Sequence, residues 1–372
     1  MKKLIVSICA AFCLMAAPLT AVEWGGLLFN DSGITTPNFS EITFSQSNGV
    51  SLWVKSPLGN SGLYMSSEVL YKYKLEIAGN ETSVFNQVID LPLFKVYGDL
   101  SAGAGVLSIN AGRFFYVDSL SAVISQVVDG VSVAYGLPLF KISGFAGYTG
   151  LLNGLNVPMA VPPQKENKIY NMAYPYLPVG LSIEFPTLAG NQSLEFNSYF
   201  LADLGSASEK NNMLYASAVL SGPVSNTIYY NAGTVFGVVN FKDMMNYSSV
   251  SMLIFPTEEI SVTAGITFGS AEQGPFVNYL SLSTVSLLSA GRITPKASFT
   301  YTTGNMSAGL NGDVMLSYED KKYSATNTDW NVEFIYNVFS DLQLGLTVNA
   351  VIDLTEAKAN NFGAKLNISL AF

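Results

Sequence analysis

The sequence contains no histidine, and its only two cysteines, Cys9 and Cys13, lie within the first 13 residues. Histidine is the commonest general base, and histidine and cysteine are the commonest ligands of transition metals. A catalytic site would therefore need carboxylates, lysine or tyrosine alone, and no such pair occurs at a suitable spacing. We expect no enzyme, no metal site and no cofactor.

Charge is also scarce, and long hydrophobic runs are absent after residue 21. Charged residues make up 12% of the chain and hydrophobic residues 49%, and the mean hydropathy is +0.31. A spanning helix needs about 18 or more consecutive apolar residues. A hydrophobic chain without such helices can still pair every backbone amide in lipid by closing a sheet. The composition, with 32 glycines and 12% aromatics, predicts an all-β transmembrane antiparallel barrel.

The first 21 residues have the features of a secretory signal peptide. A basic start at Lys2 and Lys3 precedes an apolar run over residues 4–17 and a small residue, Ala21. Cleavage after Ala17 is the alternative. We expect a signal peptide over 1–21 and a single barrel domain over 22–372. Its removal takes away two lysines and no acid, so the net charge changes from −9 to −11, which argues against nucleic acid as a partner.

The end of the chain alternates strictly between apolar and small or polar residues. Alternate side chains of a strand lie on opposite faces, so this pattern predicts a strand with lipid on one side and water on the other. We expect it to close the barrel in the outer membrane of a diderm bacterium, and to engage the barrel-insertion machinery. Its lipid-facing residues are Phe362, Leu366, Ile368, Leu370 and Phe372.

Short turns and longer segments alternate along the chain. Counting them predicts about 18 strands, with 16 to 20 allowed, and both termini beside the short turns. Short periplasmic turns and longer extracellular loops are typical of outer-membrane barrels. The longer segments include 30–48, 116–128, 150–177, 239–246 and 319–328. Residues 276–303 fit one strand with an elaborated loop before it, or two or three strands.

Several strands carry charges on the face opposite their apolar residues. A lysine facing lipid near the bilayer midplane costs about 2–4 kcal/mol, so this face must meet water or protein. A barrel of 16 to 18 strands encloses an aqueous channel. The charges balance on this face, and the net charge of −11 motivates a weak cation preference at the mouth. The predicted pore-lining residues are Lys55, Glu68, Lys72, Lys74, Glu184, Glu195, Lys296 and Glu333.

One motif pairs a glycine-arginine strand end with nearby aspartates. Residues Gly112–Asp118, followed by Asp129–Tyr135, resemble outer-membrane porins of the substrate-channel type. The overall layout, including Asn48–Lys55 and the final Phe372, resembles the porin-like outer-membrane proteins of spirochaetes. The resemblance implies that Arg113 projects into the lumen, held by Asp118 or Asp129, while 116–128 bends inward. The alternative is that the arginine-aspartate pair only anchors this loop.

These features predict a passive channel for small hydrophilic solutes or ions. One alternative is a barrel whose loops mediate adhesion or host contact. Another is a transporter of hydrophobic compounds of the fatty-acid type, which would need an N-terminal hatch and an apolar lumen. In segment 150–177, Tyr170, Tyr174 and Tyr176 are candidates for stacking on a sugar or lining a constriction, or for anchoring an exposed loop. Homo-oligomer formation stays open.

Overall fold

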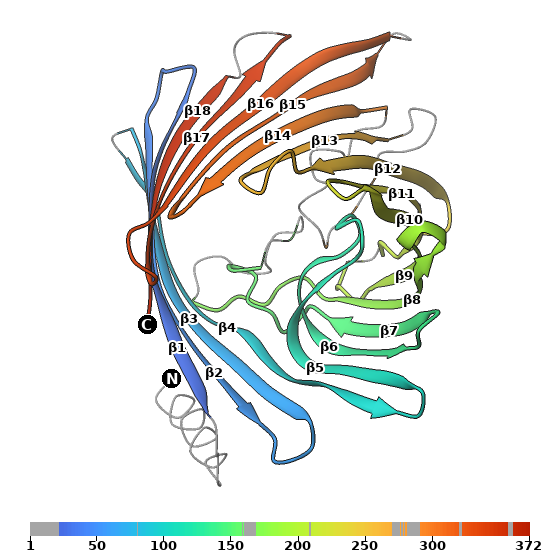
Figure 1. Cartoon of the computed structure of the whole chain (residues 1–372). Helices are drawn as coiled ribbons and strands as arrows, with labels where there is room; N and C mark the ends of the chain where they lie inside the picture. The colour runs from blue at the N-terminus through green and yellow to red at the C-terminus, as the bar shows by residue number, and fades with distance from the viewer. Residues whose placement is uncertain are drawn as a thin grey trace.

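The computed structural model is a closed antiparallel barrel (Figure 1). The structure describes residues 22–79, 81–157, 159, 169–207, 210–269, 276, 278, 280, 291–319, 322–355 and 360–372. These residues form 18 strands in one sheet, and the last strand pairs with the first. The predicted fold class and strand number are confirmed. Within the described segments, no helix is long and apolar enough to cross a membrane.

Each strand pairs with its neighbours in the sequence. Apart from the strands, the described chain has a 3₁₀ turn, η1 (Ala189–Asn191). The strands are β1 (Glu23–Pro37), β2 (Thr43–Pro57), β3 (Leu63–Ala78), β4 (Glu81–Ala102), β5 (Gly105–Val117), β6 (Ser125–Gly136), β7 (Lys141–Tyr148), β8 (Tyr176–Leu188), β9 (Gln192–Asp203), β10 (Met213–Ser225), β11 (Ile228–Val239), β12 (Asp243–Ile254), β13 (Ile260–Phe268), β14 (Ile293–Thr303), β15 (Met306–Glu319), β16 (Lys322–Asn337), β17 (Leu342–Asp353) and β18 (Asn361–Ala371).

The two rims of the barrel differ in the length of their connections. At one rim all the links are short, from residues 58–62 after β2 to residues 338–341 after β16. The other rim carries the longest connections, residues 149–175 and 269–292. The C-terminal Phe372 exchanges backbone hydrogen bonds of 2.9 and 3.0 Å with Gly26 near the start of β1. The start of β1 and the end of β18 therefore both lie at the short-turn rim. This is the predicted asymmetry.

Several predicted boundaries are wrong. The residues Gly98–Ser101 and Gly222–Ser225, whose composition predicts short turns, lie inside β4 and β10, and the chain reverses directly after these strands end. Most of segment 30–48 is strand, because its polar side chains satisfy one another. Asn30 donates a hydrogen bond to Asn48, which donates to the Tyr73 hydroxyl at 2.8 Å.

Three more predicted loops are shorter than expected. Segment 116–128 narrows to the connection 118–124, and 239–246 narrows to 240–242. Segment 319–328 is almost entirely strand, since its polar residues continue the ladder between β15 and β16. In segment 276–303 the described residues contain one strand, β14, while most of Leu280–Leu288 falls outside the described residues.

The two faces of the sheet differ in chemistry, as the alternation predicts. Phe334, Leu346 and Leu366 share one register row across β16–β18, and all three side chains are exposed on the outside. The adjacent row, displaced by one residue, holds Glu333, Thr347 and Lys365 on the inside. Because the side-chain period of a strand is two, one register fixes both faces at once.

Candidate pore constriction and solute path

The barrel wall divides where β5 leaves β4. Their ladder ends at the pair Phe94–Arg113, after which β4 pairs only with β3 and β5 only with β6. Gly112 has a φ of +122°, and a Cβ at this position would overlap the backbone oxygen of Phe94. Glycine is the residue that tolerates both conditions. It allows the end of the β5–β6 hairpin to bend into the barrel (Figure 1).

A single carboxylate organises the loop at the end of this hairpin, residues 118–124, which we call the inward loop. Asp118 Oδ1 accepts hydrogen bonds from the backbone N–H groups of Val123 (2.8 Å) and Ile124 (2.7 Å). Its Oδ2 accepts from Leu120 (3.1 Å) and Ala122 (3.3 Å). Burial raises the pKa of Asp118 above its usual value, and the four N–H donors act in the opposite direction.

The inward loop lies against an apolar part of the inner wall. Ala122, Val123 and Ile124 are fully buried, and burying an apolar side chain such as Val or Ile contributes about 1.5–3 kcal/mol. We call the assembly the inner cluster; it consists of Phe114, Ala122, Val123, Ile124, Val128, Phe145, Tyr176, Tyr199, Leu201, Met213, Tyr215, Val235, Met245, Tyr247, Phe276 and Leu280. Strands β8–β12 supply about half of these residues, so the cluster occupies one side of the lumen.

Residues from the connection between β13 and β14 fasten the inward loop from the other side. The backbone N–H of Ser125 donates to the oxygen of Leu280 at 2.9 Å, and the Asn278 side chain donates to the oxygen of Ala122. Ile124 and Leu280 form a parallel bridge. The loop is thus held by contacts that are distant in sequence, and it narrows the interior.

Arg113 lies in the seam between β4 and the inward hairpin. Its guanidinium makes two bonds of 2.7 Å to the Asp129 carboxylate and donates to the backbone oxygens of Leu91 (3.2 Å) and Leu151 (3.0 Å). Asp90 lies 3.7 Å away, and 11% of the arginine side chain is exposed. The resemblance implied a guanidinium projecting into the lumen, held by Asp118 or Asp129. In the structure Asp129 is the aspartate that holds it, and the group faces the seam.

The same seam holds the long connection 149–175. Asn156 donates to Asp90 at 2.6 Å and accepts from the Lys72 ammonium at 2.6 Å, while Asn153 donates to the backbone oxygen of Ile89 at 3.2 Å. These bonds join the asparagines of the connection to the side chains of Asp90 and Lys72 and to the backbone of β4. The connection therefore covers the inner edge of β4 where β5 no longer pairs with it.

The three tyrosines of this segment take bracing positions. The hydroxyl of Tyr170 donates to the Leu151 oxygen, and that of Tyr174 donates to Asp203 at 3.0 Å. Tyr176 is buried in the inner cluster. Residues 158 and 160–168, which complete the segment, lie outside the described part of the chain.

The other predicted pore-lining residues are spread around the wall. Lys55 pairs with Glu23 at 3.6 Å, Lys74 with Glu76 at 3.0 Å and Glu184 with Lys141 at 3.6 Å. Glu68 accepts from Ser51, and Glu195 accepts from Ser182 and from Ser119 of the inward loop. Lys296 and Glu333 make no ion pair with another described residue. Among the predicted residues, the structure pairs Arg113 with Asp129, with Lys72 nearby, and places Glu184 opposite Glu195 in the register of β8 and β9.

Opposite the inner cluster, the inside of the wall is polar. Among the described residues, none from β14–β18 or β1–β3 belongs to the cluster. The inner residues there form polar rows, such as Asp31 with Lys365 (3.2 Å) and Asn367. The apolar cluster and the polar rows of β14–β18 and β1–β3 thus occupy different parts of the inner wall.

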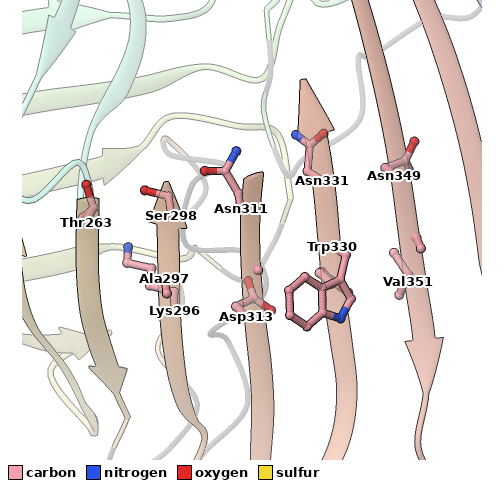
Figure 2. Close-up of a pocket in the computed structure, with 13 residues that line it drawn as sticks. Thr263, Lys296, Ala297, Ser298, Asn311, Asp313, Trp330, Asn331, Asn349 and Val351 are labelled. Carbon is pink, nitrogen blue, oxygen red and sulfur yellow. The ribbon is translucent and has the colours of Figure 1, made fainter. Parts of the chain in front are cut away.

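The polar wall contains a recess of about 500 Å³ over β13–β17, shown in Figure 2. We call it the polar recess. It includes an asparagine row, Asn311, Asn331 and Asn349, and an adjacent pair of acids, Asp313 and Asp329. Of the predicted pore-lining residues, Lys296 lies here. The alternation Gly309, Asn311, Asp313 carried a signal for the two acids that was not used, and Asp329 directly follows the predicted loop 319–328, whereas β16 begins at Lys322.

Comparison with known proteins places the fold. No protein-family model matches the chain, and no curated protein sequence matches it. Among solved structures it is similar to three Pseudomonas aeruginosa proteins. OccK3 (OpdO) has a TM-score of 0.65 at 9% identity over 96% of this chain and 97% of that one. OccK2 (OpdF) with glucuronate has 0.65 at 10%, over 95% and 98%. OpdK with vanillate has 0.61 at 11%, over 94% and 98%. At these identities the likeness shows a shared fold, an 18-stranded barrel.

Proposed function

We propose that this protein is an outer-membrane channel for the passive diffusion of small hydrophilic solutes. The observation that carries the proposal is the division of the interior. An inward loop narrows one side, while a continuous polar wall is left accessible on the other. A barrel of this size is too wide for its side chains to fill.

The structural neighbours support the same function. OpdK is an outer-membrane protein, and the neighbours include OccK2 in complex with glucuronate and OpdK in complex with vanillate. Both bound molecules are small and carry polar groups. The chain's basic start, apolar run and Ala21 support export to the same membrane, and N-terminal sequencing of the mature protein tests cleavage after that residue.

The polar wall argues against the fatty-acid type of transporter. A hydrophobic solute would follow an apolar route, whereas the accessible inner rows of β14–β18 carry amides, hydroxyls and charges. The apolar residues of the interior are already packed against one another in the inner cluster.

Conductance of the purified protein in a planar lipid bilayer tests the proposal. We expect discrete current steps in KCl solution, and swelling of liposomes in isotonic solutions of small sugars. A correctly folded protein that gives neither steps nor swelling would leave adhesion or host contact as the better function. Folding is checked on the same sample by the heat-dependent shift in gel mobility.

A further inference from the structure

The polar recess brings a row of three amides and a pair of acids together on the inner face of β15–β17. Asn311, Asn331 and Asn349 are direct cross-strand neighbours, and Figure 2 shows their amides side by side on three adjacent strands. None of the three makes a side-chain hydrogen bond to another described residue, and Asn331 Oδ1 is buried without a partner. Each amide offers donors and an acceptor.

Two carboxylates lie directly beside this row. Asp313 and Asp329 face each other across β15 and β16, and each has one buried oxygen without a hydrogen-bond partner. Like charges placed directly opposite in a sheet are destabilising. Buried polar groups are normally satisfied, so unsatisfied acceptors in a recess mark a place where a ligand or water supplies the donors.

Lys296 does not neutralise the pair. It stands in the same register row as Asp313, but its side chain lies across Gly265 on the neighbouring strand. A Cβ added to that glycine would be 3.2 Å from the Cε of Lys296. Figure 2 shows its ammonium extended toward Thr263 on β13. Neither aspartate has an ion pair within the described residues. Two acids and one base leave the recess with a formal charge of −1.

We propose that the polar recess is a binding station for hydroxyl-rich solutes without negative charge, such as neutral sugars, polyols and amino sugars. This deepens the proposed channel function and depends on it. Vicinal hydroxyls donate to the two aspartates and exchange hydrogen bonds with the asparagine row, while Lys296 and Ser298 supply donors at the edge. The volume of about 500 Å³ accommodates a solute of this size. The carboxylates repel a uronic acid, so the station differs in charge preference from a glucuronate site.

Solute permeation into liposomes carrying the full-length channel tests the station. The probes are glucosamine, glucose and glucuronate, which are similar in size and differ in charge. We expect the wild type to pass glucose faster than glucuronate, with glucosamine at least as fast as glucose. In D313N/D329N the ratio of glucose to glucuronate rates should fall toward one. In N331A/N349A glucose uptake at low concentration should fall by at least about two- to tenfold, since the loss of a single hydrogen bond to either amide has that effect.

A matched control removes the same charge elsewhere. E258Q/E259Q takes two acids from the exposed turn between β12 and β13, and its rate ratio should equal that of the wild type. Unchanged ratios in D313N/D329N, in a channel that still conducts KCl, would overturn the station and leave the channel intact. A wild type that favours glucuronate would overturn it as well. A wild type with no conductance at all would instead refute the proposed function.

Discussion

Replacement of Arg113 by alanine tests whether this residue braces the seam or selects solutes. The arginine makes two 2.7 Å bonds to Asp129, bonds to two backbone oxygens and lies 3.7 Å from Asp90. Its removal leaves both carboxylates with fewer partners. Breaking a buried pair by deleting one partner costs about 3–5 kcal/mol.

The structure places R113A at the lower end of that range. The Asp129 side chain is 23% exposed, so water can reach it, whereas Asp90 at 3% keeps a hydrogen bond from Asn156. We expect a loss of about 3 kcal/mol in the free energy of unfolding. Most barrels should still fold, and protease should cut connection 149–175 faster, because the bonds from Arg113 to the Leu151 oxygen (3.0 Å) and the Tyr170 hydroxyl (3.5 Å) are gone.

Urea unfolding in detergent micelles measures this loss, with the fluorescence of the three tryptophans as the signal. The matched control is K74A, which breaks the ion pair to Glu76, in which the side chains are 51% and 34% exposed. Exposed pairs contribute about 0–1 kcal/mol. The bracing role is refuted if R113A unfolds within 1 kcal/mol of the wild type while its ion selectivity changes. Unchanged selectivity with the expected destabilisation supports it.

Three other changes test the constriction and the barrel closure. D118A leaves four N–H donors without an acceptor, three of them buried at about 1–3 kcal/mol each. The inward loop should therefore loosen and the single-channel conductance should rise; an unchanged step size contradicts this. Because residues 22–372 contain no cysteine, oxidation of I124C/L280C should form one disulfide, seen as a shift on a non-reducing gel; the single-cysteine variants are controls, and no shift would argue against the contact between the two connections. F372A removes the ring that covers Gly26. The loss of stability should be about 1–2 kcal/mol, because part of the ring is exposed, and the ratio of folded to unfolded protein in membranes should fall. An equal ratio would show that this ring does not support closure.

The sequence was most informative where its information is local. Alternation such as Leu342, Leu344 and Leu346 against Gln343 and Gly345 specifies a strand, its two faces and its register relative to lipid and water. Turn residues then gave the number of strands. Boundaries were less certain where polar side chains pair with each other inside a strand, as Asn30 and Asn48 do, since such segments have the composition of a loop.

The candidate site depended on contacts that local patterns do not contain. The motif around Arg113 indicated an arginine-aspartate pair, and the aspartate that holds it, Asp129, is the direct cross-strand partner in the hairpin register. Asp118 has a different part: it caps its own loop through backbone N–H groups. No pattern in the sequence indicated that β5 separates from β4 at Gly112.

The sequence by itself determined that this chain closes into a barrel of about 18 strands with an apolar outside and a polar inside. Period-two alternation is enough for that, because every strand obeys the same geometry. Only the tertiary structure decided which side of the lumen is filled and which stays accessible. The reason is physical: the inward loop is held by bonds such as that between Ala122 and Asn278, 156 residues apart. Such long-range packing leaves no trace in the period of either segment.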